Sequence, residues 1–294
     1  MLVEAKRFGS VLARAVGDVQ LDTTTTSLCI TASTGRHTLP TWVGEFPLLP
    51  VPTTRPIVTM SGSELLRMVH AVAYAMSTDA TREHLHGTLI DRDEHGVLRL
   101  VAADGHRLVV ARTDSVGPRF SVTVHRAAID VLARLDLDDN EPVEIYVGSS
   151  RVHFSSPSTT VSGRVIDLPF PSWPQVIPTA LAGWITLPRR ETLSALRAIV
   201  VGPRTGVRID VDREREVVRL STSDGDGHKA AIELPVTISG EPPERVGFAH
   251  RYLREMFEAI DDEFVQVGLG GALDPMKVET TRSDALAVLM PMRI

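Results

Sequence analysis

The sequence predicts an α+β protein built from repeated βαβββ units. Amphipathic helices are expected at 5–16, 62–78, 125–135, 189–200 and 250–260, and their first residues lie 57 to 64 residues apart. Between them, short segments alternate apolar and polar residues with period two, which is typical of half-buried antiparallel strands. A repeat of about 60 residues is longer than most solenoid repeats and fits a βαβββ unit. Five such units are therefore expected.

Each expected helix carries apolar residues on one face at helical spacing, as a helix packed against a core does. The stripes of the second and third helices are Leu65, Leu66, Val69, Val72 and Ala73, and Ile129, Val131, Leu132 and Leu135. The strand segments recur in the same order after each helix. They are expected at 96–101, 143–147, 151–154, 207–211, 217–221, 265–267 and 276–279.

Two proline-rich joints, at 46–56 and 170–178, mark the expected domain boundaries. The three expected domains are 1–54, 55–178 and 179–294. The second and third hold two repeats each, which fits two helices on one face of paired sheets. The first holds a single repeat, which opens almost directly on its helix.

The composition is that of a soluble globular protein, with 43% hydrophobic and 23% charged residues in 294. No apolar run approaches the length of a membrane span, and the first residues lack the layout of a signal peptide. Cys29 is the only cysteine, which excludes a disulfide framework within the chain. A reducing cytoplasm is therefore the expected location.

Charge is unevenly distributed along the chain. The net charge is −6, which argues against a simple nucleic-acid binder. The five expected helices nevertheless carry +6 together, so the remainder carries −12. If the helices share one face, that face is basic on an acidic body, which suits contact with phosphates irrespective of base sequence. The alternative for any single helix is an ordinary solvated face.

The last seven residues, 288–294, are largely apolar and include Pro291, which cannot donate to a sheet ladder. By themselves they predict a last edge strand that completes a core. Their two methionines also suit contact with varied apolar partners. A second local feature is the Asp104-Gly105 pair, which predicts a tight hairpin turn with Gly105 at positive φ.

No catalytic or metal motif stands out. His84, His86 and His106, with Asp104, are the residues that could gather around a metal, and a strand would place His84 and His86 on one face. No paired cysteines or H-E-x-x-H motif support such a site. The glycines at 268–271 lack the lysine of a phosphate loop, and 224–227 lack the final Glu of a calcium loop. We expect no cofactor and no enzyme, with a hydrolase using His106 and Asp104 as a remote alternative.

Four motifs together resemble the bacterial sliding clamp family, the beta subunit of the replicative DNA polymerase III holoenzyme. They are 82–87 (Arg-Glu-His-Leu-His-Gly), 103–108 (Ala-Asp-Gly-His-Arg-Leu), 170–178 (Phe-Pro-Ser-Trp-Pro-Gln-Val-Ile-Pro) and 288–294 (Val-Leu-Met-Pro-Met-Arg-Ile). Their order and spacing are those of the family, and the likeness is strongest from residue 57 onward. The resemblance implies the DNA clamp fold, a head-to-tail ring with helices lining a central hole and antiparallel sheets outside.

The resemblance also implies a groove that binds short apolar peptides of polymerases, the clamp loader and repair proteins. Carried over by position, its residues are Leu85, Ala103, Gly105, His106, Arg107, Leu108, Pro171, Gln175, Val176, Val288, Leu289, Met290, Pro291, Met292 and Arg293. Ala103 departs from the Thr that the family commonly has, and Gln175 departs from a common Arg. The loss of that Arg removes a donor fork for a partner carboxylate or carbonyl.

The implied partners further include double-stranded DNA, bound without base readout, and a second copy of the chain. The DNA candidates are Arg7, Arg82, His125, Arg126, Arg134 and Arg197. The candidate subunit-interface residues are His37, Leu39, Ile199 and Val200. The implied function is a non-catalytic processivity factor, cytoplasmic and nucleoid-associated, that encircles duplex DNA and tethers the replicative polymerase.

Residues 1–54 resemble only the second half of the family's first domain, and the first half, about 65 residues, has no counterpart. Two explanations are open. In the first, the start is set too late, an in-frame repeat precedes Met1 and a homodimeric ring is expected. In the second, the chain is a shortened clamp-like paralogue that binds peptides without forming a stable ring.

Overall fold

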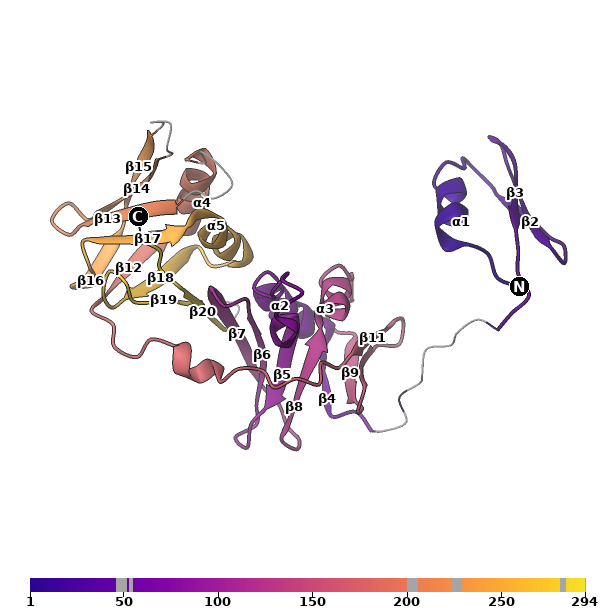
Figure 1. Cartoon of the computed structure of the whole chain (residues 1–294), viewed down its shortest axis with the longest axis horizontal. Helices are drawn as coiled ribbons and strands as arrows, with labels where there is room; N and C mark the ends of the chain where they lie inside the picture. The colour runs from indigo at the N-terminus through magenta and orange to yellow at the C-terminus, as the bar shows by residue number, and fades with distance from the viewer. Residues whose placement is uncertain (46–51, 53–54, 200–205, 224–228, 281–283, 294) are drawn as a thin grey trace. The chain divides into compact units, whose positions relative to one another are not determined.

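The computed structural model describes residues 1–45, 52, 55–199, 206–223, 229–280 and 284–293. It divides into two compact units, Met1–Val51 and Pro52–Ile294 (Figure 1). The predicted interface residue Val200, the terminal Ile294 and most of the first proline-rich joint lie outside the described residues. The two units are taken in turn.

The first unit is one helix against one small sheet. Its elements are α1 (Ala5–Leu12), β1 (Gln20–Thr23), β2 (Ser27–Ala32) and β3 (Gly35–Pro40), with the strands in the order β1-β2-β3. Leu28, Ile30 and Leu39 form its buried core. The unit opens almost directly on its helix, as predicted, and a single bridge between Leu2 and Trp42 stands where the other repeats have a first strand. The helix was predicted to reach residue 16 but ends at Leu12.

The second unit contains four successive βαβββ repeats, which confirms the predicted repeat. The first two repeats are β4 (Val58–Ser61), α2 (Gly62–Ala73), β5 (Gly87–Arg92), β6 (Val97–Ala103) and β7 (Arg107–Asp114), then β8 (Phe120–His125), α3 (Arg126–Leu132), β9 (Pro142–Val147), β10 (Arg151–Ser155) and β11 (Thr160–Arg164). Short 3-10 helices η1 (Glu83–Leu85) and η2 (Trp173–Val176) lie in the connections.

The last two repeats follow the second proline-rich joint. They are β12 (Gly183–Pro188), α4 (Arg189–Ala198), β13 (Gly206–Asp212), β14 (Val217–Ser223) and β15 (Lys229–Pro235), then β17 (Arg245–Ala249), α5 (His250–Ala259), β18 (Phe264–Leu269), β19 (Met276–Glu279) and β20 (Ala285–Leu289), with the extra strand β16 (Thr237–Gly240) between them. Figure 1 shows α2, α3, α4 and α5 on one side of this unit and the sheets on the other.

Local chemistry explains where the helices begin and end. The Ser61 side chain accepts a hydrogen bond from the Glu64 backbone N–H at 3.2 Å and so caps the start of α2. His125 caps α3 in the same way, because its Nδ1 accepts from the Ala127 N–H at 3.2 Å. The helix predicted for 62–78 ends at Ala73, and Tyr74 and the residues after it turn back toward η1.

The nine-stranded sheet β16-β12-β18-β19-β20-β7-β6-β5-β8 corrects the prediction for the C-terminus. β20 is not an edge strand, because it pairs with β19 on one side and antiparallel to β7 on the other, from Ala285 opposite Ala111 to Leu289 opposite Arg107. Both of its faces are covered, with Val288 in one apolar cluster and Leu289 in another. A strand that is apolar on both faces belongs inside a sheet.

Two four-stranded sheets, β11-β10-β9-β4 and β15-β14-β13-β17, complete the unit. The main core lies between the helices and the sheets and runs without a break through both halves of the unit, from Val58 to Leu289. Among the described residues, no helix is long and apolar enough to cross a membrane.

Candidate functional site

The turn between β6 and β7 forms the centre of the site. Oδ1 of Asp104 accepts the backbone N–H groups of His106, at 2.9 Å, and Arg107, at 3.0 Å. Gly105 has φ +90°, as the Asp-Gly prediction required. Nη1 of Arg82 donates to the Asp104 backbone carbonyl at 2.8 Å. The turn is therefore fixed both by the Asp104 side chain and by Arg82.

An apolar cleft of about 150 Å³ opens beside this turn. Its floor is formed by Leu108 and Val288, on the face of the nine-stranded sheet where these two are buried with Val101 and Val110. Phe170, Trp173 and Ile177, from the connection between the middle and last repeats, pack partly exposed on the same cluster. The cleft therefore exists because β20 joins β7 and because the connection crosses the joined strands.

The chain after β20 forms one rim of the cleft. The Met290 N–H donates to the His106 carbonyl at 2.8 Å, and the Met292 N–H donates to the Gly247 carbonyl at 2.8 Å. Pro291 between them has no N–H, so the ladder stops and the tail leaves the sheet. Met290 stays 43% exposed at the rim, where an incoming apolar group can reach it.

Most of the predicted cleft residues are brought together here. Those that line the cleft are Leu85, Ala103, Gly105, Arg107, Leu108, Pro171, Val176, Val288 and Met290. Those that do not are His106, Gln175, Leu289, Pro291, Met292 and Arg293. The side chain of Leu289 points to the opposite face of the sheet from Val288, because neighbouring residues of a strand alternate.

The prediction passed over Phe170, Ser172 and Trp173, which also line the cleft. All three lie within the 170–178 motif, so the segment was found but these positions were not. The signal was the two aromatic side chains: an aromatic residue in a proline-rich connection buries its ring against whatever apolar surface the connection crosses.

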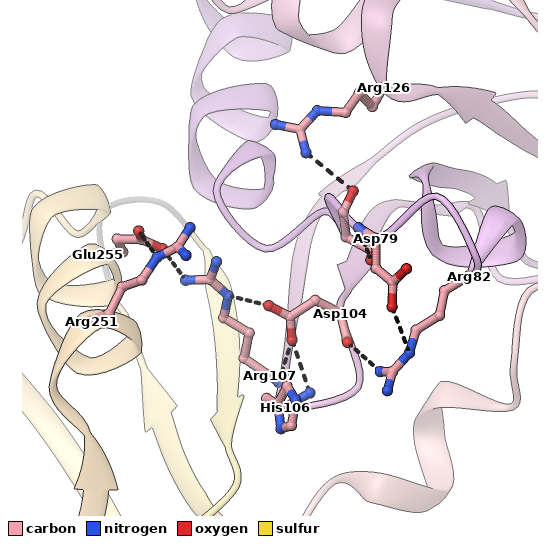
Figure 2. A network of polar contacts seen from close by, with 9 residues as sticks. Asp79, Arg82, Asp104, His106, Arg107, Arg126, Arg251 and Glu255 are labelled. Atoms are coloured by element: carbon pink, nitrogen blue, oxygen red, sulfur yellow. Dashed lines mark hydrogen bonds and ion pairs between the residues drawn. The ribbon is translucent and has the colours of Figure 1, made fainter. Parts of the chain in front are cut away.

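A second, polar hollow of about 430 Å³ lies beside the cleft, and we call it the polar cavity. It is lined by the chain after α2, including Tyr74 and Asp79, by Arg82, Asp104, His106, Arg107 and Arg126, and by Arg251, Tyr252 and Glu255 of α5. Figure 2 shows Arg107 reaching from the turn toward α5, between Asp104 and Glu255. Arg107 lines both hollows.

Arg107 is only 7% exposed and pairs with two carboxylates. Its Nε donates to Oδ2 of Asp104 at 3.0 Å, and its Nη1 donates to Oε2 of Glu255 at 2.6 Å. Its guanidinium carbon lies 5.0 Å from the ring centre of Tyr74 and 4.6 Å from that of Tyr252. Planar guanidinium groups suit this combination of ring stacking and carboxylate pairing.

Burial and charge both shift the pKa values of the groups around Arg107. Burial by itself raises the pKa of Glu255, but hydrogen bonds from Arg251 and Arg107 outweigh it and leave that pKa below its ordinary value. Burial raises the pKa of the Tyr74 hydroxyl, which is therefore neutral. Burial also raises the pKa of Tyr252, and the negative charge of Asp104 adds to this rise.

The predicted DNA residues come from several different elements. Arg7 on α1 is exposed and pairs with Glu4 at 2.9 Å. Arg134 is exposed just after α3. Arg197 on α4 pairs with Glu258 at 3.1 Å.

The other three DNA candidates lie together near the polar cavity. Arg82 lies beside η1, not on a long helix. Arg126 donates to Asp130 at 3.0 Å and to the Ser77 carbonyl at 3.1 Å. His125 caps α3, and burial, followed by the nearby Arg164, lowers its pKa. A neutral histidine with Nδ1 accepting a backbone N–H adds no positive charge.

The predicted interface residues differ in exposure. His37 and Leu39 lie on β3, an edge of the first unit's sheet, with His37 exposed and Leu39 buried in the core of that unit. Ile199 is 1% exposed and packs in the main core, so its side chain is not a surface contact.

Among the described residues, the histidines and Asp104 considered for metal binding or hydrolysis do not form such a site. In the described part of the chain, no group of three or more His, Cys, Asp or Glu side chains could hold a metal ion. His84 lies in the short helix η1, so the strand face assumed for His84 and His86 does not exist. Asp104 bonds the backbone of His106, while the His106 ring stacks on Tyr252. They do not form a catalytic pair.

Comparison with known proteins finds similarity to one family. The family description "DNA polymerase III beta subunit, central domain" matches residues 59–172. The beta sliding clamp of Caulobacter vibrioides is 28% identical over 278 residues, covering 91% of this chain and 74% of the relative. That of Synechococcus elongatus is 27% identical over 241 residues, covering 79% and 64%, so this chain spans less than two thirds of that relative's length.

Solved structures agree. The sliding clamp of Pseudomonas aeruginosa bound to griselimycin is 25% identical, with a TM-score of 0.87, and the match covers 99% of this chain and 81% of that one. The beta subunit of Streptococcus pyogenes has a TM-score of 0.88 at 18% identity, with the same coverage, which shows the shared fold.

Proposed function

We propose that this chain is a bacterial sliding clamp, a beta subunit of DNA polymerase III, and acts as a non-catalytic processivity factor in DNA replication. In this role it encircles duplex DNA without reading bases. It tethers the replicative polymerase, the clamp loader and other partners through short apolar peptide segments bound in the cleft.

The observation that carries this proposal is the apolar cleft beside the paired strands β7 and β20. Its lining is almost wholly apolar and comes from segments far apart in the sequence, among them Leu85, Leu108, Trp173 and Met290. An apolar groove with a few polar groups at its margin is what recognition of an extended peptide requires. Within the lining, Arg107 and the turn backbone supply those polar groups.

Peptide binding tests the cleft directly. The probe is a fluorescein-labelled peptide that carries the core Leu-Ala-Leu-Phe. We expect Val176→Asp, or removal of residues 290–294, to weaken binding at least about tenfold, because either change replaces or removes apolar contact area. The matched control is Val131→Asp, an equally exposed valine on α3 outside the cleft. Unchanged affinity in both cleft variants would reject the cleft.

The helix side of the second unit is the proposed DNA surface. The exposed Arg134 and Arg197 are the best-placed of the candidates, and Arg7 belongs to the corresponding helix of the first unit. We expect Arg134→Gln and Arg197→Gln each to reduce the slope of log affinity against log salt by about 1. Arg219→Gln, an exposed arginine on the sheet strand β14, serves as the control and should leave the slope unchanged.

Encirclement is tested by topology. Chain loaded by a clamp loader should be retained on nicked circular DNA and lost when the circle is made linear, because a ring slides off a free end. Equal retention on both would favour ordinary electrostatic binding. A monomer that still binds the peptide probe would favour the shortened, ring-less form.

Further parts of the proposal concern organisation. We propose three domains, 1–54, 55–178 and 179–294, with the edge strand β3, including His37 and Leu39, as the surface that meets a second copy head to tail. Cytoplasmic location with nucleoid association follows from the proposed DNA binding.

A further inference from the structure

The polar cavity beside the cleft has hydrogen-bond donors to spare. Nη2 of Arg107 has no hydrogen-bond partner among the described residues, since Nε and Nη1 make the two bonds to Asp104 and Glu255. The same holds for Nη2 of Arg126, whose Nε and Nη1 are used. Arg251 uses only Nε, toward Glu255 at 2.8 Å, and leaves both Nη atoms available.

The carboxylate oxygens of the cavity, in contrast, are mostly occupied. Both carboxylate oxygens of Asp104 accept, Oδ1 from two backbone N–H groups and Oδ2 from Arg107. Both oxygens of Glu255 accept, Oε1 from Arg251 and Oε2 from Arg107. Oδ1 of Asp79 accepts from the N–H and the hydroxyl of Thr81, and its Oδ2 faces Arg82 at 3.7 Å. A ligand for this cavity must therefore bring acceptors.

The charge of the lining limits what that ligand is. Four arginines and three carboxylates give a net charge of +1. A net charge of +1 is neutralised by one ligand group that carries a single negative charge. A duplex would bring a row of phosphates past Asp79, half of whose side chain is exposed, and like charges repel. A single carboxylate matches the planar guanidinium donors and brings one negative charge where a duplex brings several.

The position of Arg107 connects this cavity to the cleft. Its side chain lines both hollows, and the turn Asp104–Arg107 is the wall between them. A chain seated in the cleft can thus reach the polar cavity within a few residues, since an extended residue spans about 3.3 Å. Figure 2 shows the guanidinium groups of Arg107 and Arg251 close to one another beside Glu255.

We propose that the polar cavity holds one carboxylate of a partner peptide, an Asp or Glu side chain that flanks the apolar residues bound in the cleft. This inference rests on the proposed peptide-binding function. It makes Arg251 a specificity-determining residue: it selects partners that carry an acid beside their apolar segment.

The test compares two labelled peptides at low ionic strength. One is Glu-Gly-Leu-Ala-Leu-Phe-Gly-Glu and the other replaces both Glu residues by Gln. The chain should bind the acidic peptide about five- to tenfold more tightly. Arg251→Gln should abolish this preference and leave affinity for the Gln peptide unchanged. Arg254→Gln, which removes the same charge from α5 outside the cavity, should keep the preference.

The outcomes separate the two proposals. If neither peptide binds, the proposed cleft fails. If both bind equally well to the unaltered chain, the cleft stands and the carboxylate site is overturned. A preference that survives Arg251→Gln also overturns it, because the acid is then held elsewhere. Displacement of the acidic peptide, but not of its Gln twin, by a short DNA duplex would mark the cavity as a phosphate site and overturn the inference.

Discussion

Nη1 of Arg107 donates to Oε2 of Glu255 at 2.6 Å, although the two residues are 148 positions apart. Arg107 begins β7 in the middle repeats, and Glu255 lies on α5 in the last repeat. The pair therefore joins the two halves of the second unit on the helix side of the sheet, while the β7–β20 ladder joins them within the sheet. Together these contacts set the walls of the cleft.

Loss of the carboxylate should destabilise the unit. Glu255→Gln leaves the buried Arg107 guanidinium without its charged partner, which costs roughly 1–3 kcal/mol for a charge-assisted bond. Urea unfolding monitored by circular dichroism measures this cost. The control is Glu258→Gln on the same helix, whose partner Arg197 is exposed, so a change within about 0.5 kcal/mol is expected. Equal costs for the two variants would show that Arg107 is not the reason.

The same pair predicts a pH dependence. The pKa of Glu255 is lowered from its ordinary value of 4.5 in the folded chain. Its contribution to stability is therefore fully present above that value and is lost as pH falls through the lowered folded pKa. The urea concentration at which half of the protein is unfolded should decrease as the pH is lowered from 6. This decrease should be less steep in Glu255→Gln than in the unaltered chain. Parallel curves for the two proteins would contradict the assignment.

Gly105 should not tolerate a side chain. At φ +90° an L residue is strained, and a Cβ there would lie 2.2 Å from Nη1 of Arg82. We expect Gly105→Ala to cost about 1–2 kcal/mol from the backbone conformation, with the close contact adding to it. Arg82→Ala removes the contact but not the backbone strain. The cost of Gly105→Ala should thus be smaller in that background, and an identical cost would exclude the contact as a cause.

Trp173 should report binding in the cleft. Its ring is partly exposed, packs on the apolar cluster that contains Leu108 and Val288, and lines the cleft. In a variant with Trp42→Phe and Trp184→Phe, the remaining tryptophan emission should shift to shorter wavelength when the apolar peptide probe binds, because its exposed edge loses water. A titration whose emission stays constant while anisotropy shows binding would place the peptide away from Trp173.

Local sequence determined the repeat and its parts. The stripes of α2 and α3, the period-two strands and the Asp104-Gly105 turn depend on contacts within a few residues, so their pattern is visible in the chain. One position of the α3 stripe was wrong, because Val131 is 47% exposed. Helix ends were less accurate. The segment predicted for 62–78 stops at Ala73, because the turn toward η1 depends on tertiary packing and not on helix propensity.

Tertiary structure alone decided how the repeats combine. Nothing in 288–294 says that β20 pairs with β7 and lies inside a sheet, since strand pairing is a contact between distant segments. That pairing sends Val288 to the cleft and Leu289 to the opposite core, and it brings Glu255 to Arg107. The apolar residues Val288 and Leu289 specified by themselves that they would be buried. Which surfaces bury them, and hence the cleft and the polar cavity, was decided by the fold.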